Sequence, residues 1–121
     1  MTNRQMLARL RKICLAQPDA VETHNWGCEW FRIHGKFFCV FHGPQDAPGI
    51  GCKVGKTDQG IFLDDPRFFK THYMWHHGWV SLQANGKLDW EEVEELVKGS
   101  YALVSTSGKS RRKTTGGSQD D

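Results

Sequence analysis

Four basic residues lie on or beside segments whose apolar residues alternate as in β-strands: Arg32, Lys36, Lys53 and Lys56. Strict alternation places Arg32 on the face of Trp30, and Lys36 on the face of Phe38 and Val40. Basic groups beside aromatic rings can hold phosphates while the rings stack on bases. The pattern therefore predicts a nucleic-acid-binding surface. The alternative is charge that protects an exposed sheet edge from pairing.

Metal chemistry is a second possibility. His72 and His76 are four residues apart and would share one face of a helix, as in some zinc sites. His42, His77 and Cys39 could supply further ligands. The stretch lacks the glutamate of the H-E-x-x-H motif, and a strand-like run begins soon after it. We therefore interpret residues 72–77 as a polar loop of unassigned role and expect no metal or other cofactor.

Covalent catalysis needs an accessible nucleophile beside a base. Cys14 lies on the apolar stripe of a helix and Cys39 within an apolar strand, so both are expected in the core. The positions of Cys28 and Cys52 are open. The carboxylates of residues 64–65 and 91–95 fit a turn and a solvated helix face, and residues 49–53 lack the spacing of a phosphate-binding loop. We expect a binding module, with no catalytic residues, and not an enzyme.

Charge is unevenly distributed along the 121 residues, whose net charge is +2. Residues 1–104 contain 12 Lys or Arg and 12 Asp or Glu, so the basic excess lies near the C-terminus. A neutral body limits how tightly nucleic acid can bind. No apolar run is long enough to cross a bilayer. Four cysteines without a C-x-x-C pair, and no signal peptide, predict free thiols in the cytoplasm.

The elements that must position these residues follow from hydrophobic periodicity. Helices are predicted from residue 2 or 3 to 16, and from residue 89, where Asp89 and Glu92 form a capping box. Strands are predicted over residues 29–34, 36–41, 50–54 and 78–83, with His34-Gly35 as a hairpin turn. Residues 66–70 could form a helical turn. Residues 105–121 contain no apolar residue and are expected to be a disordered basic tail.

This order of elements predicts one α+β domain over residues 1–104, with an antiparallel sheet and helices on one of its faces. Several ordered segments of this domain are similar to the MmcQ/YjbR family. They are residues 11–22, Trp26-Gly27, residues 31–33 and 35–38, residues 52–54, residues 66–69, Tyr73, residues 78–80, Asp89-Trp90 and residues 95–101, which end in Ser100-Tyr101.

The resemblance covers roughly residues 10 to 104 and implies a five-stranded antiparallel sheet flanked by N- and C-terminal helices, as in secretion-chaperone-like folds. It also implies DNA binding through hairpins, and it supplies no catalytic residues. We therefore expect weak, phosphate-mediated DNA binding by a monomer or weak homodimer that does not associate with membranes. The alternative is a protein-interaction or small-ligand-binding module that uses the aromatic face of the sheet.

Overall fold

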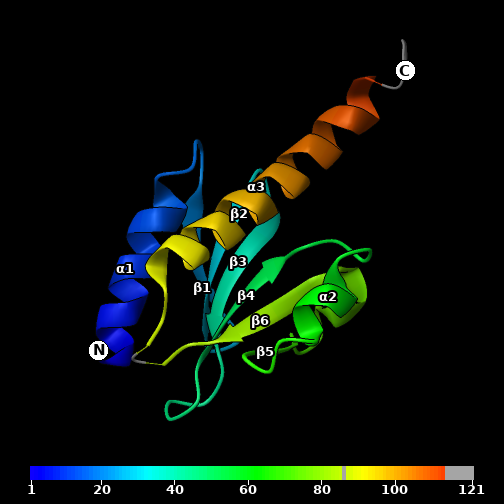
Figure 1. Cartoon of the computed structure of the whole chain (residues 1–121). Coiled ribbons are helices and arrows are strands. Elements are labelled where there is room, and N and C mark those ends of the chain that lie inside the picture. The colour runs from blue at the N-terminus through cyan, green and yellow to red at the C-terminus, as the bar shows by residue number, and fades with distance from the viewer. Residues whose placement is uncertain (86, 114–121) are drawn as a thin grey trace.

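The computed structural model describes the backbone of residues 1–85 and 87–113, with side chains as far as Thr106. It is an α+β fold, as predicted, in which two long helices cover one face of an antiparallel sheet (Figure 1). The helices are α1 (Asn3–Leu15) and α3 (Trp90–Lys113), and two shorter ones, α2 (Gln59–Leu63) and the 3-10 turn η1 (Trp75–His77), lie between strands. No helix in the described part of the chain is both long and apolar enough to cross a bilayer.

The sheet has six strands, and all neighbouring pairs are antiparallel. Its order is β1-β2-β3-β4-β6-β5, with bounds β1 Val21–Asn25, β2 Cys28–Ile33, β3 Lys36–His42, β4 Gly49–Lys53, β5 Phe68–Lys70 and β6 Trp79–Gln83. The predicted count of five was therefore one strand short. The missed edge strand β1 is mostly polar and its side chains are exposed or half-buried, so its sequence has little apolar alternation.

One local prediction was wrong. Residues 66–70 were expected to form a helical turn, but Phe68–Lys70 is edge strand β5, whose partners on β6 run from Leu82 to Val80. The helix α3 extends to Lys113 and so reaches into the segment expected to be a disordered basic tail. Extending an existing helix avoids the cost of nucleation. The expectation of disorder over residues 114–121 lies outside the described residues.

Local signals account for the helix and hairpin boundaries. Thr2 and Gln5 form a reciprocal capping box at the start of α1, which ends at Leu15, one residue before the predicted end. The turn between β2 and β3 is confirmed, because His34 and Gly35 have φ of 49° and 80°. Two consecutive positive φ values are typical of the type I′ hairpin turn.

The main core lies between the helices and the sheet. It buries one side of each long helix: Met6, Leu10 and Cys14 of α1, and Val93 and Val97 of α3. The strands contribute Phe31, Phe38, Ile50, Val80 and Leu82, among others. A β-bulge at Phe38 interrupts the alternation, because Phe31 pairs with Cys39 while Arg32 pairs with Phe37. The bulge determines which residues of β3 face the opposite side of the sheet.

Candidate functional site

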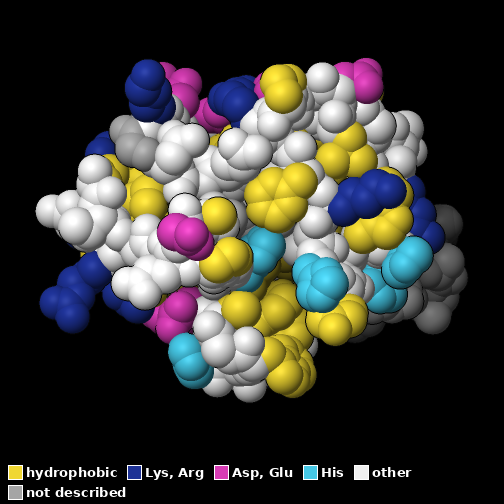
Figure 2. Space-filling model, turned by 90° about the horizontal axis from the view of Figure 1, so that it is seen from below, with side chains coloured by type: hydrophobic (Ala, Val, Ile, Leu, Met, Phe, Trp, Pro, Cys, Tyr) yellow, Lys and Arg dark blue, Asp and Glu magenta, His cyan; other side chains and the backbone are white. Residues whose placement is uncertain are grey.

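The sheet face opposite the helices carries a second, smaller apolar cluster. It consists of Trp30, Val40 and Trp79, one from each of β2, β3 and β6, with Cys28, Phe37 and Met74 packed against it. Neither α1 nor α3 covers this face. We call it the open face. Hydrophobic side chains adjoin several histidines on the side of the molecule seen from below (Figure 2).

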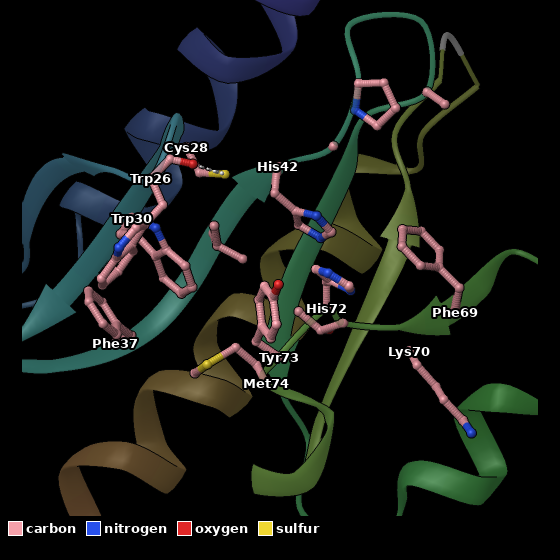
Figure 3. Close-up of a pocket in the computed structure, with 15 residues that line it drawn as sticks. Trp26, Cys28, Trp30, Phe37, His42, Phe69, Lys70, His72, Tyr73 and Met74 are labelled. Atoms are coloured by element: carbon pink, nitrogen blue, oxygen red, sulfur yellow. Dashed lines mark hydrogen bonds between the residues drawn. The ribbon is translucent and has the colours of Figure 1, made fainter.

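A pocket of about 820 Å³ lies on the open face. That volume is within the range of sites that take drug-sized ligands. One wall comes from the β1–β2 turn and from β2 and β3, and the other from β5 and the loop that follows it (Figure 3). The residues that line it are Trp26, Cys28, Trp30, Phe37, Val40, His42, Gly43, Pro44, Ala47, Phe69, Lys70, Thr71, His72, Tyr73 and Met74. No carboxylate is among these lining residues.

The first wall is built from three aromatic rings. Trp30 and Phe37 have ring centroids 4.4 Å apart, and Trp26 meets both edge-on at 5.9 and 6.4 Å. The Trp30 indole donates from Nε1 to the carbonyl oxygen of Asn25 at 3.1 Å, which fixes its orientation. Trp30 is buried, whereas Trp26 is 78% exposed at the tip of the β1–β2 turn. The wall is therefore a buried aromatic base with an exposed edge.

The second wall is a loop of polar and aromatic residues. Tyr73 is 84% exposed, and its ring lies 4.1 Å from the imidazole of His72. Thr71 anchors this loop, because its carbonyl oxygen accepts the backbone N–H groups of Met74 at 3.2 Å and Trp75 at 2.9 Å. The loop therefore has a defined backbone conformation without being part of a helix or strand.

The floor of the pocket contains a short polar chain. His42 Nε2 lies 2.7 Å from the Ser81 hydroxyl, which lies 2.8 Å from the Thr71 hydroxyl. Ser81 and Thr71 are buried, at 0% and 2% exposure, and His42 is half-buried. Burial lowers the pKa of His42 below its usual 6.5, and the nearby His72 lowers it further. The neutral imidazole is therefore the predominant form at pH 7.

Two glycines of β4, Gly49 and Gly51, leave space beside the pocket floor that a side chain would fill. A Cβ on Gly51 of β4 would meet Val40 Cγ1 at 2.8 Å, Ser81 Oγ at 3.1 Å and Thr71 Cγ2 at 3.2 Å. A Cβ on Gly49 would meet the end of the Phe69 ring at 2.7 Å. The two contacts below 3.0 Å are closer than real Cβ atoms allow and the others are tight, so β4 presents bare backbone to the open face at Gly49 and Gly51.

The register places the four predicted nucleic-acid-binding residues near one end of the sheet but not on one face. Arg32 is on the open face, as predicted, with its guanidinium carbon 5.6 Å from the centre of the Phe37 ring. Lys53 is paired with Trp79 and so also belongs to the open face. Lys36 is paired with Ile33 of the main core and belongs to the helix-covered face. Lys56 is exposed in the loop after β4.

One prediction, about which β3 side chains share a face of the sheet, was therefore wrong. Lys36, Phe38 and Val40 were expected to share a face, but Phe38 belongs to the main core and Val40 to the open-face cluster. The bulge at Phe38 adds one residue to β3 and reverses the alternation beyond it.

Cys14 and Cys39 are buried, as predicted, and Cys52 is buried beside Cys39 with their sulfur atoms 3.8 Å apart. Burial and a hydrogen bond with Cys14 raise the pKa of Cys39 well above the usual value for a thiol. A hydrogen bond with Cys39 and burial do the same for the pKa of Cys52. Cys28 lines the pocket, and burial raises its pKa as well. All four cysteines are free. Neutral thiols are weak nucleophiles.

No cluster of three or more His, Cys, Asp or Glu in the described part of the chain could hold a metal ion. His72 lies in the loop before η1, and His76 lies within η1, so the two do not share a helix face.

Sequence reasoning missed the pocket as a site. It used Trp26 and Tyr73 only as part of the family resemblance, and it considered His42 only as a metal ligand. The sequence pattern that links these three residues is weak, because they lie in turns and at a strand end, where side chains follow no period. Only the pairing of β4 with β6, and of β6 with β5, brings Ser81 and Thr71 next to His42.

Comparisons with known proteins support the fold. Among solved structures, protein DR2400 of Deinococcus radiodurans, which has a DUF419 domain, is similar with a TM-score of 0.72 and 21% identity, over 84% of this chain and 80% of that one. A protein from Pseudomonas syringae is similar with a TM-score of 0.66 and 19% identity, over 85% of this chain and 98% of that one. A comparison with curated protein sequences gives no match. The YjbR family model matches residues 15–103, and the chain belongs to the YjbR family.

Proposed function

We propose that this protein is a non-enzymatic binding module whose open-face pocket takes a small organic ligand. The observation that carries the proposal is the pocket itself, a cavity of about 820 Å³ with aromatic walls and a single polar chain at its floor. Binding sites are typically concave and mostly apolar, with a few well-placed polar groups that orient the ligand. The sheet rigidly supports the aromatic residues of the first wall and the polar groups at the floor.

The pocket's chemistry favours binding over catalysis. His42 and Ser81 are within hydrogen-bond distance, as in a nucleophile–base pair. Ser81 has no exposed surface, so its hydroxyl cannot reach a ligand's reacting atom. Cys28 has a raised pKa and is a poor nucleophile. The polar chain is therefore assigned to orienting His42.

The test is a titration followed by ¹H–¹⁵N spectra with three probes: indole, 2-naphthoate and decalin-2-carboxylate. We expect at least one probe to shift the amides of residues 26–30, 40–47 and 69–74 together. Ala47→Trp, which places a ring at the pocket's exposed loop, should abolish the shifts. Ala102→Trp, on the exposed surface of α3, is the matched control and should retain them. If no probe shifts these amides, the ligand-binding proposal is wrong.

DNA binding is the second candidate, as a weak, phosphate-mediated contact by a monomer or weak dimer. It is favoured by the Arg32 guanidinium, whose buried Nε lacks a hydrogen-bond partner within the described part of the chain and which lies beside an aromatic ring. Arg32 and Lys53 are on the open face, two strands apart, roughly 10 Å in the hydrogen-bonding direction. Four free cysteines fit a reducing compartment, so we propose a cytoplasmic location for either function.

Fluorescence anisotropy with a labelled duplex over a salt series tests this candidate. Two phosphate contacts give a slope of log K against log salt of roughly −2, and Arg32→Gln with Lys53→Gln should remove it. Lys98→Gln, on α3, is the matched control and should leave the slope unchanged. Absence of binding at low salt, or an unchanged slope in the double variant, would eliminate this surface as a DNA contact.

A further inference from the structure

The hydrogen bonds at the pocket floor assign the tautomer of His42. The Ser81 and Thr71 hydroxyls have one proton each, and both are buried. If His42 donated to Ser81, Ser81 would donate to Thr71, and the Thr71 proton would have no acceptor among the hydrogen bonds of the described residues. If instead Thr71 donates to Ser81 and Ser81 donates to His42 Nε2, every hydroxyl proton is used. Buried donors are almost always satisfied, so the second arrangement is favoured.

This arrangement makes His42 a hydrogen-bond donor toward the pocket. With Nε2 accepting from Ser81, the proton of the neutral imidazole is on Nδ1. No hydrogen bond between described residues uses Nδ1, and His42 lines the pocket. The lining contains no carboxylate that could accept from it or attract a cationic ligand. A ligand that completes the site must therefore offer an acceptor oxygen or nitrogen at this point.

Two exposed aromatic residues at the pocket edge have positive φ angles, a backbone conformation that is unfavourable for large side chains. Trp26 has φ of 53° and occupies the first central position of the two-residue β1–β2 turn, followed by Gly27 at φ 75°. Tyr73 has φ of 65° at the third position of the turn from Thr71 to Met74. Both positions favour Gly or Asn, because a left-handed conformation strains other side chains.

Neither ring compensates for this strain by being buried, since Trp26 and Tyr73 are 78% and 84% exposed. They come from opposite walls, Trp26 beside Trp30 and Phe37, and Tyr73 beside His72 and Met74 (Figure 3). Residues held in a strained backbone conformation tend to cluster at binding sites. Large rings on both walls suit a flat aromatic partner, because ring–ring contacts add to the gain from buried area.

We propose that the open-face pocket binds a planar aromatic molecule that carries an acceptor group, such as a carbonyl or carboxylate. Its ring contacts Trp26 and Tyr73 at the two walls, and its acceptor receives a hydrogen bond from His42 Nδ1. The proposal rests on the proposed ligand-binding function and names the ligand class for the same site.

The ring requirement is tested with matched probes. 2-Naphthoate and decalin-2-carboxylate have the same carboxylate and similar size, but only the first is flat and aromatic. We expect 2-naphthoate to bind about tenfold more tightly. The cation 2-naphthylmethylammonium, which keeps the ring but replaces the acceptor by donors, should bind at least about tenfold more weakly than 2-naphthoate. Equal affinity for the naphthyl and decalin acids, or for anion and cation, would overturn the proposed ligand class while leaving the pocket a binding site.

The role of His42 has two independent readouts. His42→Leu should weaken 2-naphthoate binding about tenfold, while His76→Leu, on η1 and outside the pocket, should not. Long-range ¹H–¹⁵N spectra of the unmodified protein should show His42 protonated at Nδ1 and unprotonated at Nε2. A protonated Nε2, or unchanged binding by His42→Leu, would overturn the donor assignment. The spectra decide even if the Leu variant fails to fold.

Substitution of the two wall residues should affect stability and ligand binding in opposite directions. Trp26→Asn and Tyr73→Gly suit the left-handed backbone better, so Tm should be unchanged or higher, while 2-naphthoate binding should weaken about tenfold. A lower Tm with unchanged binding would assign the rings a structural role and overturn their part in the proposal. If no probe binds the unmodified protein at all, the proposed function fails first, and the ligand class with it.

Discussion

The Ser100 hydroxyl of α3 donates a 2.6 Å hydrogen bond to the carbonyl oxygen of Phe38, the bulge residue of β3. The Ser100 hydroxyl oxygen in turn accepts the backbone N–H of Lys53 on β4 at 2.9 Å. The β3–β4 ladder ends at the pair Cys39–Cys52, one residue before these two groups. One helical side chain therefore continues the strand pairing where the bulge interrupts it.

Ser100→Ala should destabilise the protein by about 2–4 kcal/mol, because it leaves the Phe38 carbonyl and the Lys53 N–H buried without partners. Urea denaturation followed by far-UV circular dichroism measures the change. Ser105→Ala removes a helical hydroxyl whose hydrogen bonds among the described residues go to the carbonyls of Tyr101 and Ala102, and serves as the control with little effect. Equal stabilities of the two variants would contradict the bridging role.

Tyr101→Phe should cost about 0.5–1.5 kcal/mol. The Tyr101 hydroxyl donates to the carbonyl oxygen of Pro18 at 2.7 Å and ties α3 to the segment between α1 and β1. Its ring packs edge-on against Phe38 at 5.4 Å, a contact that phenylalanine retains. Tyr73→Phe, at an exposed position whose hydroxyl has no hydrogen bond among the described residues, should leave stability unchanged in the same denaturation experiment.

Gly51→Ala should cost about 1–3 kcal/mol, because the added methyl group would overlap Val40 and crowd Ser81 and Thr71 at the pocket floor. The same variant should weaken binding of the naphthoate probe. Gly60→Ala, on the exposed side of α2 with open space around the new Cβ, should instead stabilise the protein by about 0.5–1 kcal/mol. Thermal unfolding of both variants measures the contrast, and a neutral Gly51→Ala would show that the floor is not tightly packed.

Stability should fall on acidification through a contribution from His42. Burial and the facing His72 hold its folded-state pKa below the usual 6.5, so the unfolded chain binds a proton first as pH falls. The stabilising contribution is therefore fully present above pH 6.5 and is lost as pH falls from there toward the folded-state pKa. His42→Gln should flatten the slope of unfolding free energy against pH in this window, by at most about 1.4 kcal/mol per pH unit. Parallel curves for the two proteins would show that His42 titrates equally in both states.

The Ser100 bridge also gives a physical reason for part of the family resemblance. The sequence segment that ends in Ser100-Tyr101 was recognised only as a motif. In the fold, Ser100 continues the β3–β4 pairing and Tyr101 anchors α3 to Pro18. Neither role is visible in the sequence, because the partners are 47 to 83 residues away.

Local sequence patterns alone predict the fold class, both long helices, the β2–β3 hairpin and the burial of Cys14 and Cys39. These features depend on local periodicity, capping and turn residues, which act over a few neighbouring positions. The faces that the β3 side chains occupy, and the pocket itself, arise only when the strands pair. A single bulge residue, Phe38, inverts the alternation after it, and the register of the four strands β3, β4, β6 and β5 brings His42, Ser81 and Thr71 together. Strand pairing is a long-range choice, made by the packing of the whole sheet against its helices, so no local pattern encodes it.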